Sequence, residues 1–148
     1  MLWIYSFCAV LLILIIAVPL HDLKCLWPAA LLGLVKGLIV DSKFAGLNAY
    51  SFLYGNPVLL GLPTYYWLSG GVFVALVVHF LPKKKILRLP YSVAFSLALL
   101  VMEHIAIYYG YFFRYKWTDL DSLLLNLIVI ASCISLLDWL GMTNNKKG

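Results

Sequence analysis

Charged side chains are scarce in this sequence. Only 11% of its 148 residues are Asp, Glu, Lys or Arg, whereas 64% are apolar or aromatic. Soluble domains contain about a quarter of charged and about half of apolar residues. Because so little polar surface is available to water, the composition excludes an ordinary soluble domain and predicts that a lipid bilayer surrounds most side chains.

Cysteine is also rare, and the sequence contains no familiar catalytic motif. Cys8, Cys25 and Cys133 are widely spaced, which excludes a disulfide framework and a zinc site. A nucleophile elbow, a phosphate-binding loop and a metalloprotease motif are all missing from the sequence. We therefore predict no metal and no cofactor, and the motifs give no support for an enzymatic activity.

The first residues lack the features of a cleaved secretory signal. Met1 to Phe7 contains no Lys or Arg, and the apolar run from Leu2 to Leu20 is longer than the core of such a signal. The sequence therefore predicts that this segment remains as a transmembrane helix.

Long apolar runs, in contrast, are plentiful. A helix of about 20 apolar residues crosses the roughly 30 Å of hydrocarbon in a bilayer. The expected spans are residues 2–20, 26–40, 63–81, 90–113 and 122–140. Glycine, asparagine and proline interrupt residues 41–62, which we predict to be an interfacial outer loop. The sequence thus predicts an all-α membrane bundle of five transmembrane helices, forming one domain over residues 1–148.

The second span contains a lysine and two glycines. Its eight strongly apolar residues contribute about 2 to 5 kcal/mol on an insertion scale, whereas a lysine at mid-helix costs about 2.5 to 3.5 kcal/mol. Lys36 lies near one end of the span, where its side chain can reach the interface, so its cost is lower. Insertion is therefore expected to be marginally favourable.

Lys and Arg are unevenly distributed between the connections. Five spans with an outside N-terminus place seven of them in the cytoplasm and three outside. The first group is Lys24, Lys83, Lys84, Lys85, Arg88, Lys146 and Lys147, and the second is Lys43, Arg114 and Lys116. Without the second span the balance is six against five, so the positive-inside rule favours five spans and a cytoplasmic C-terminus. This clustering accounts for the net charge of +5 without a nucleic-acid partner.

Five polar residues inside the predicted spans are candidates for function, because polar groups within a bilayer are costly and often functional. They are Lys36, Glu103, His104, Asn126 and Asp138. Residue counting places Lys36 and Glu103 in the outer half of the membrane, so we expect them to form an ion pair. Two interpretations of this pair stay open: it only locks two helices together, or Glu103 is a protonatable or ligand-binding carboxylate.

The remaining candidates have simpler interpretations. His104 points about 100 degrees away from Glu103 on a helix, and we expect it to be a hydrogen-bonded packing residue. Asn126 is expected to link helices by hydrogen bonds. Asp138 lies near the inner boundary, where Lys83 or the lysines at the C-terminus are the expected partners.

Small residues recur every fourth position along one face of the second span, at Ala29, Gly33 and Gly37. Such a face predicts close packing against another helix. That helix belongs either to the same chain or to a partner, which is a second copy or another membrane protein.

Residues 81–122 resemble a group of small bacterial multi-pass membrane proteins that have no assigned activity. The resemblance rests on a glutamate in the fourth span, followed by a glycine, an outer tryptophan and a serine. The matching residues are Glu103, Gly110, Trp117 and Ser122, with Trp27 and Pro28 at the start of the second span. The resemblance implies a protein of the bacterial inner or plasma membrane. A buried acid near outer aromatic residues is also similar to small membrane terpenoid cyclases, in which intramembrane carboxylates donate protons.

Three classes of function remain open. The first is an accessory or scaffold membrane protein, in which Lys36 neutralises Glu103. The second is a small-solute or proton-coupled transporter, which needs a cavity that water reaches at Glu103. The third is a membrane enzyme acting on a lipid or isoprenoid, which needs a lateral opening and a second acid or histidine near Glu103.

Overall fold

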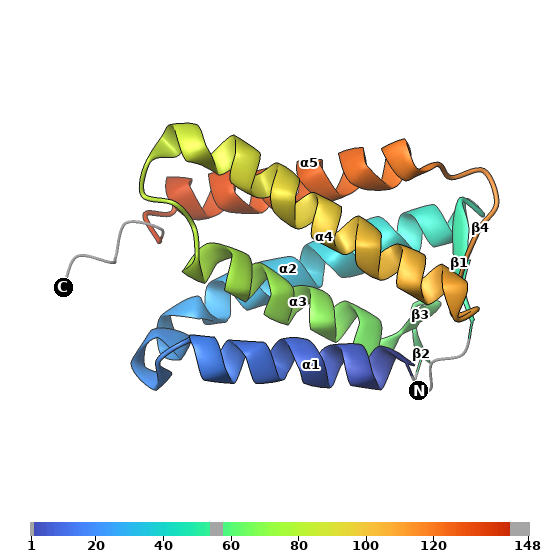
Figure 1. The fold of residues 1–148 in the computed structure, drawn as a ribbon, viewed down its shortest axis with the longest axis horizontal. Helices are drawn as coiled ribbons and strands as arrows, with labels where there is room; N and C mark the ends of the chain where they lie inside the picture. The colour runs from blue at the N-terminus through green and yellow to red at the C-terminus, as the bar shows by residue number, and fades with distance from the viewer. Residues whose placement is uncertain (1, 54–57, 143–148) are drawn as a thin grey trace.

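The structure is a computed structural model that describes residues 2–53 and 58–142. Within these residues five α-helices run roughly side by side, and two short β-ribbons lie together at one end (Figure 1). The helices are α1 (Leu2–Ala17), α2 (Leu20–Gly46), α3 (Thr64–His79), α4 (Arg88–Tyr108) and α5 (Asp119–Trp139), and a 3₁₀ turn, η1 (Lys85–Leu87), precedes α4. The prediction of a helical chain with five helices is confirmed.

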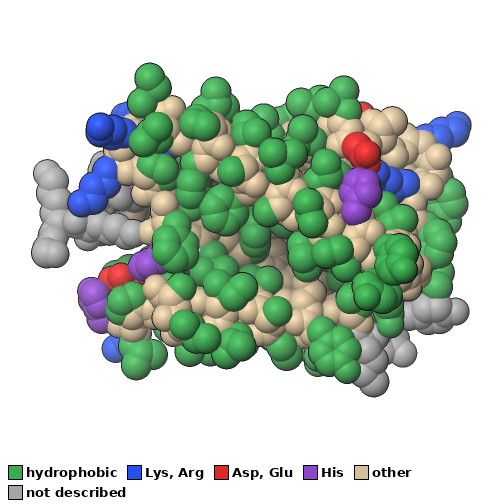
Figure 2. Space-filling model, in the orientation of Figure 1, with side chains coloured by type: hydrophobic (Ala, Val, Ile, Leu, Met, Phe, Trp, Pro, Cys, Tyr) green, Lys and Arg blue, Asp and Glu red, His purple; other side chains and the backbone are tan. Residues whose placement is uncertain are grey.

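Three helical segments are long and apolar enough to cross a membrane, namely Leu20–Gly46, Lys85–Tyr108 and Asp119–Trp139. The helices α1 and α3 are also apolar but have 16 residues each, which corresponds to about 24 Å. Large apolar side chains cover much of the surface, and the charged side chains gather at the two ends (Figure 2). An apolar surface this extensive is typical of a protein surrounded by lipid.

Helix α2 is much longer than the predicted second span of residues 26–40. It begins at Leu20, directly after Pro19, so residues 21–25, which lie between the first two predicted spans, belong to this helix. It continues to Gly46 because residues 41–45 contain no glycine or proline. The predicted loop at 41–62 is therefore wrong over its first six residues.

The connection between α4 and α5 also differs from the prediction. The fourth span was expected to reach residue 113, but α4 ends at Tyr108. The reason is Gly110, whose φ of +73° turns the chain out of the helix. Before α5 begins, the Thr118 side chain and the Asp121 side chain form a reciprocal capping box.

Two antiparallel ribbons close one end of the bundle, which we call the ribbon end. The strands β1 (Tyr50–Phe52) and β4 (Phe112–Arg114) pair with each other, and β2 (Val58–Leu59) pairs with β3 (Leu62–Pro63). Aromatic rings from α1, α3 and this first ribbon pack against one another beneath the strands. We call this group the aromatic cap, and it consists of Trp3, Tyr50, Phe52, Tyr66 and Phe112.

Helix α3 packs between α1 and α2, while α2 also contacts α5, and α5 packs along α4. The contact between α2 and α3 is close, because a Cβ atom added to Gly33 would lie 2.7 Å from Val74 Cβ, and one added to Gly71 would lie 2.4 Å from Leu34 Cγ. The small-residue face of α2 thus contacts a helix of the same chain at Gly33. Association with a second copy or another membrane protein stays a prediction.

Helices α3 and α4 meet near the end opposite the ribbons. There the Tyr91 hydroxyl donates a hydrogen bond to the carbonyl oxygen of Val77 at 2.7 Å, and the rings of Phe73 and Phe95 lie 5.4 Å apart. Together with Ile130 these side chains form a compact floor. Toward the ribbon end, a cavity separates α3 from α4.

Candidate functional site

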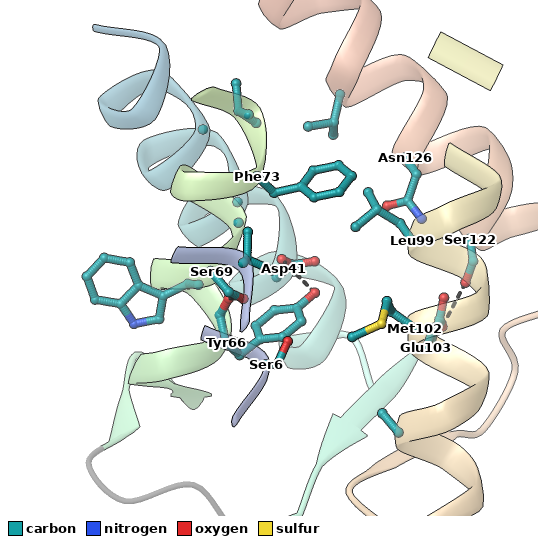
Figure 3. A pocket seen from close by; sticks show the side chains of 18 of the residues that line it. Ser6, Asp41, Tyr66, Ser69, Phe73, Leu99, Met102, Glu103, Ser122 and Asn126 are labelled. Carbon is teal, nitrogen blue, oxygen red and sulfur yellow. Dashed lines mark hydrogen bonds between the residues drawn. The ribbon is translucent and has the colours of Figure 1, made fainter. Parts of the chain in front are cut away.

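A cavity of about 460 Å³ extends from the aromatic cap to the floor, and Phe80 at the end of α3 also lines it. All five helices contribute to its walls, and most of the described lining residues are aliphatic or aromatic. The polar lining residues gather toward the ribbon end, where Figure 3 shows Asp41 on the side of α2 and Glu103 on the side of α4. The volume falls in the range of about 300 to 1,000 Å³ that is usual for small-molecule sites.

The cavity opens onto the apolar outer surface. Four residues that line it are also well exposed, namely Ile13 (53%), Phe80 (50%), Met102 (44%) and Ile105 (39%). They belong to α1, to the end of α3 and to α4, so the opening lies between α4 and the α1–α3 pair. The same face of the molecule is hollowed at this place (Figure 2).

Glu103 is held by two donors on one of its oxygen atoms. Arg114 Nε and Ser122 Oγ each donate a hydrogen bond of 2.9 Å to Glu103 Oε1, and Trp117 Nε1 donates to Ser122 Oγ at 2.8 Å. The turn at Gly110 makes this possible, because it brings β4 back beside the end of α4. Glu103, Trp117 and Ser122, three of the residues on which the sequence resemblance rests, are thus linked by consecutive hydrogen bonds.

The Glu103–Arg114 ion pair is mostly buried, with side chains 15% and 14% exposed. Arg114 also pairs with Asp119. Burial by itself lowers the pKa of Arg114, but the hydrogen bonds and charges of these two acids raise it above its ordinary value. The guanidinium is therefore a permanent cation, and Glu103 is the carboxylate that it neutralises.

The predicted ion pair between Lys36 and Glu103 is wrong. Lys36 Nζ instead donates a hydrogen bond of 2.5 Å to Ser132 Oγ on α5. Glu103 bonds Ser122, which is ten residues or about 15 Å away from Ser132 along the same helix. The error arises because α2 continues to Gly46, which places Lys36 deeper than a helix ending near residue 40 would place it.

Asp41 is a site residue that the sequence analysis missed. Tyr50 Oη donates to Asp41 Oδ1 at 2.6 Å, and Tyr66 Oη donates to Asp41 Oδ2 at 3.2 Å. Burial, followed by the charge of Asp41, raises the pKa of Tyr50 well above its ordinary value, so this phenol remains a donor. The sequence signal that was overlooked is the unbroken run to Gly46, which keeps Asp41 on a helix.

The other predicted candidates lie at different places. His104 Nδ1 is 2.9 Å from the carbonyl oxygen of Leu100, and its Nε2 is 3.4 Å from Asp119 Oδ1, on the exposed side of α4. Asn126 lines the cavity about one turn of α5 after Ser122, farther from the ribbon end (Figure 3).

Asp138 lies at the opposite end of the bundle from the cavity's polar groups. It forms an ion pair with Arg88 at the start of α4, which the sequence analysis did not foresee. The C-terminal lysines that were expected as partners, Lys146 and Lys147, lie outside the described residues.

Comparison of the chain with family models, with curated proteins and with solved structures finds no match. The resemblance to bacterial multi-pass membrane proteins therefore stays a prediction.

Proposed function

We propose that this chain is a membrane-embedded binding protein for a lipid-like amphiphile. The observation that carries the proposal is the cavity of about 460 Å³, whose walls are apolar and which ends in carboxylates. Its opening lies on a surface covered by apolar side chains, so a ligand with a hydrocarbon chain can enter sideways from the bilayer. The carboxylate end then receives the polar head of the ligand.

The proposed topology is five spans, with the ribbon end outside and the α1–α2 turn inside, in a bacterial cell membrane. Among the described residues, Lys43, Arg114 and Lys116 lie at the ribbon end. Five Lys and Arg residues lie at the opposite end, namely Lys24, Lys83, Lys84, Lys85 and Arg88. This excess supports a cytoplasmic location for the opposite end.

The polar end of the cavity should determine which ligand of this kind binds. A hydrocarbon chain that moves from lipid into an apolar cavity leaves one apolar environment for another, so the hydrophobic effect contributes little to binding. The chain gains only packing contacts. Selectivity must therefore come from the groups at the ribbon end, Asp41, Glu103 and Asn126.

A second candidate is an enzyme that acts on a lipid or isoprenoid. The presence of a second acid, Asp41, in the same cavity as Glu103 favours it. The scaffold and transporter interpretations stay predictions, and the scaffold loses its expected pairing of Lys36 with Glu103.

Native mass spectrometry of the full chain, purified in a mild detergent, tests the proposal. We expect a bound lipid-sized molecule in the wild type and its loss in Gly70→Leu. Gly70 lines the cavity, and a Cβ atom there meets nothing within 4 Å, so the substitution is not opposed at the Cβ atom and the larger side chain takes up space at the cavity wall. Gly46→Leu is the matched control, because Gly46 has equally free space but does not line the cavity.

Equal occupancy in Gly70→Leu and Gly46→Leu contradicts the proposal, and so does a wild type that binds no amphiphile at all. The mass of the released ligand separates the two candidates. A binding protein returns the added ligand unchanged, whereas an enzyme returns a molecule of altered structure after incubation.

A further inference from the structure

We infer that the head of the ligand is a cationic nitrogen and that Asp41 is the residue that selects it. This inference rests on the proposed function, because it assumes that the cavity holds an amphiphile. It names the chemical class of the head, for which a neutral hydroxyl and an anionic phosphate or carboxylate are the alternatives.

The charges on the cavity wall are of one sign. Among the described residues that line the cavity, two are acidic, Asp41 and Glu103, and none is Lys, Arg or His. The nearest guanidinium, that of Arg114, does not line the cavity and already pairs with both Glu103 and Asp119. The described wall is therefore complementary to a positive charge and repels an anionic head.

Asp41 is the acid whose charge is not matched. Within the described residues, no Lys, Arg or His nitrogen lies within 4 Å of its carboxylate, whereas Glu103 has Arg114 at 2.9 Å. The two donors to Asp41, Tyr50 and Tyr66, are neutral phenols, which satisfy hydrogen bonds but supply no opposite charge.

The carboxylate of Asp41 also has unused acceptor capacity. Each of its oxygens accepts one phenol, so about half of its roughly four acceptor positions are filled by described residues. An ammonium group has three donors and a full positive charge, so it fills these positions and neutralises Asp41 at once. A hydroxyl head donates one hydrogen bond and leaves the charge unmatched, which is costly at this depth.

Three probes with the same hydrocarbon chain and different heads test the inference: hexadecylamine, hexadecan-1-ol and hexadecanoate. Their affinities for the purified full chain are measured by calorimetry in detergent. We expect the amine to bind about ten- to a hundredfold more tightly than the alcohol, and hexadecanoate to bind most weakly. This order is tested in the unmodified protein, so it does not depend on any variant folding.

Asp41→Asn then assigns the preference to one residue. Asparagine has a similar shape: its amide oxygen accepts from one phenol, and its NH2 group donates to the oxygen of the other. We therefore expect alcohol binding to persist while the amine preference falls to about one. Asp22→Asn removes the same charge near the opposite end of the bundle and should keep the wild-type preference.

The possible results distinguish a failure of the inferred cationic head from a failure of the proposed binding function. An amine preference that is absent from the wild type, or unchanged in Asp41→Asn, overturns the inference but leaves the binding function intact. If none of the three probes binds and Gly70→Leu changes nothing, the proposed function itself fails.

Discussion

Neighbouring glycines on α3 give a sharp test of how the helices pack. Gly70 and Gly71 are adjacent on the same helix. A Cβ atom added to Gly70 meets open space. A Cβ atom on Gly71 would lie 2.4 Å from Leu34 Cγ and 2.9 Å from the backbone oxygen of Ala30. We therefore predict opposite effects of Gly70→Ala and Gly71→Ala on the free energy of unfolding.

The magnitude follows from two terms. Replacing glycine by alanine in a helix stabilises it by about 1 kcal/mol, and this gain is common to both variants. Gly71→Ala also carries an overpacking cost of about 1 to 3 kcal/mol. The Leu34 side chain can rotate away, but the Ala30 carbonyl belongs to α2, so α2 and α3 must separate and the cost lies toward the upper end of the range. The common gain cancels in the difference between the variants.

Unfolding of the full chain by a graded addition of denaturing detergent, followed by circular dichroism, measures this difference. We expect Gly70→Ala to be more stable than the wild type by about 1 kcal/mol. Gly71→Ala should be less stable than Gly70→Ala by about 2 to 3 kcal/mol. Equal stabilities of the two alanine variants would falsify the close packing of α2 on α3.

Three further predictions concern individual side chains. Arg114→Gln leaves the mostly buried Glu103 without its cation and should destabilise the chain by about 3 kcal/mol in the same unfolding assay. Adding Glu103→Gln should restore part of this loss. If the effects of the two substitutions are instead additive, the pairing is contradicted. Lys36→Met removes a partly buried charge whose described hydrogen-bond partner is the neutral Ser132. The variant should therefore have a free energy of unfolding about 1 to 2 kcal/mol higher and unfold at a higher detergent concentration, and a loss of stability refutes this reasoning. Thr118→Ala removes the capping box of α5 and should cost about 1 kcal/mol, measured as a lower melting temperature, whereas an unchanged melting temperature shows that the cap is dispensable.

The helices were predictable because long apolar runs, separated by polar or helix-breaking residues, mark most of their extent. Leu2–Ala17 and Asp119–Trp139 follow directly from apolar runs of the sequence. The ends of helices depend on local chemistry that is harder to read. The positive φ of Gly110 ended α4 early, and the absence of glycine and proline from residues 41–45 extended α2.

The candidate site was predictable only in part, because its contacts join segments that are distant in sequence. Glu103 was identified as an intramembrane acid, but its partner Arg114 reaches it only through the turn and strand that follow α4. The error in the length of α2 had two effects: it gave Lys36 the wrong partner, and it assigned Asp41 to a loop. One misplaced helix end therefore accounts for both faults in the predicted site.

The arginines of the α4–α5 hairpin have a mechanical consequence. Arg88 joins the start of α4 to Asp138 near the end of α5, and Arg114 joins Glu103 on α4 to Asp119 at the start of α5. Because ion pairs join them at both ends, α4 and α5 resist separation from each other. Any change in the width of the opening between α4 and the α1–α3 pair would therefore have to move α4 and α5 together.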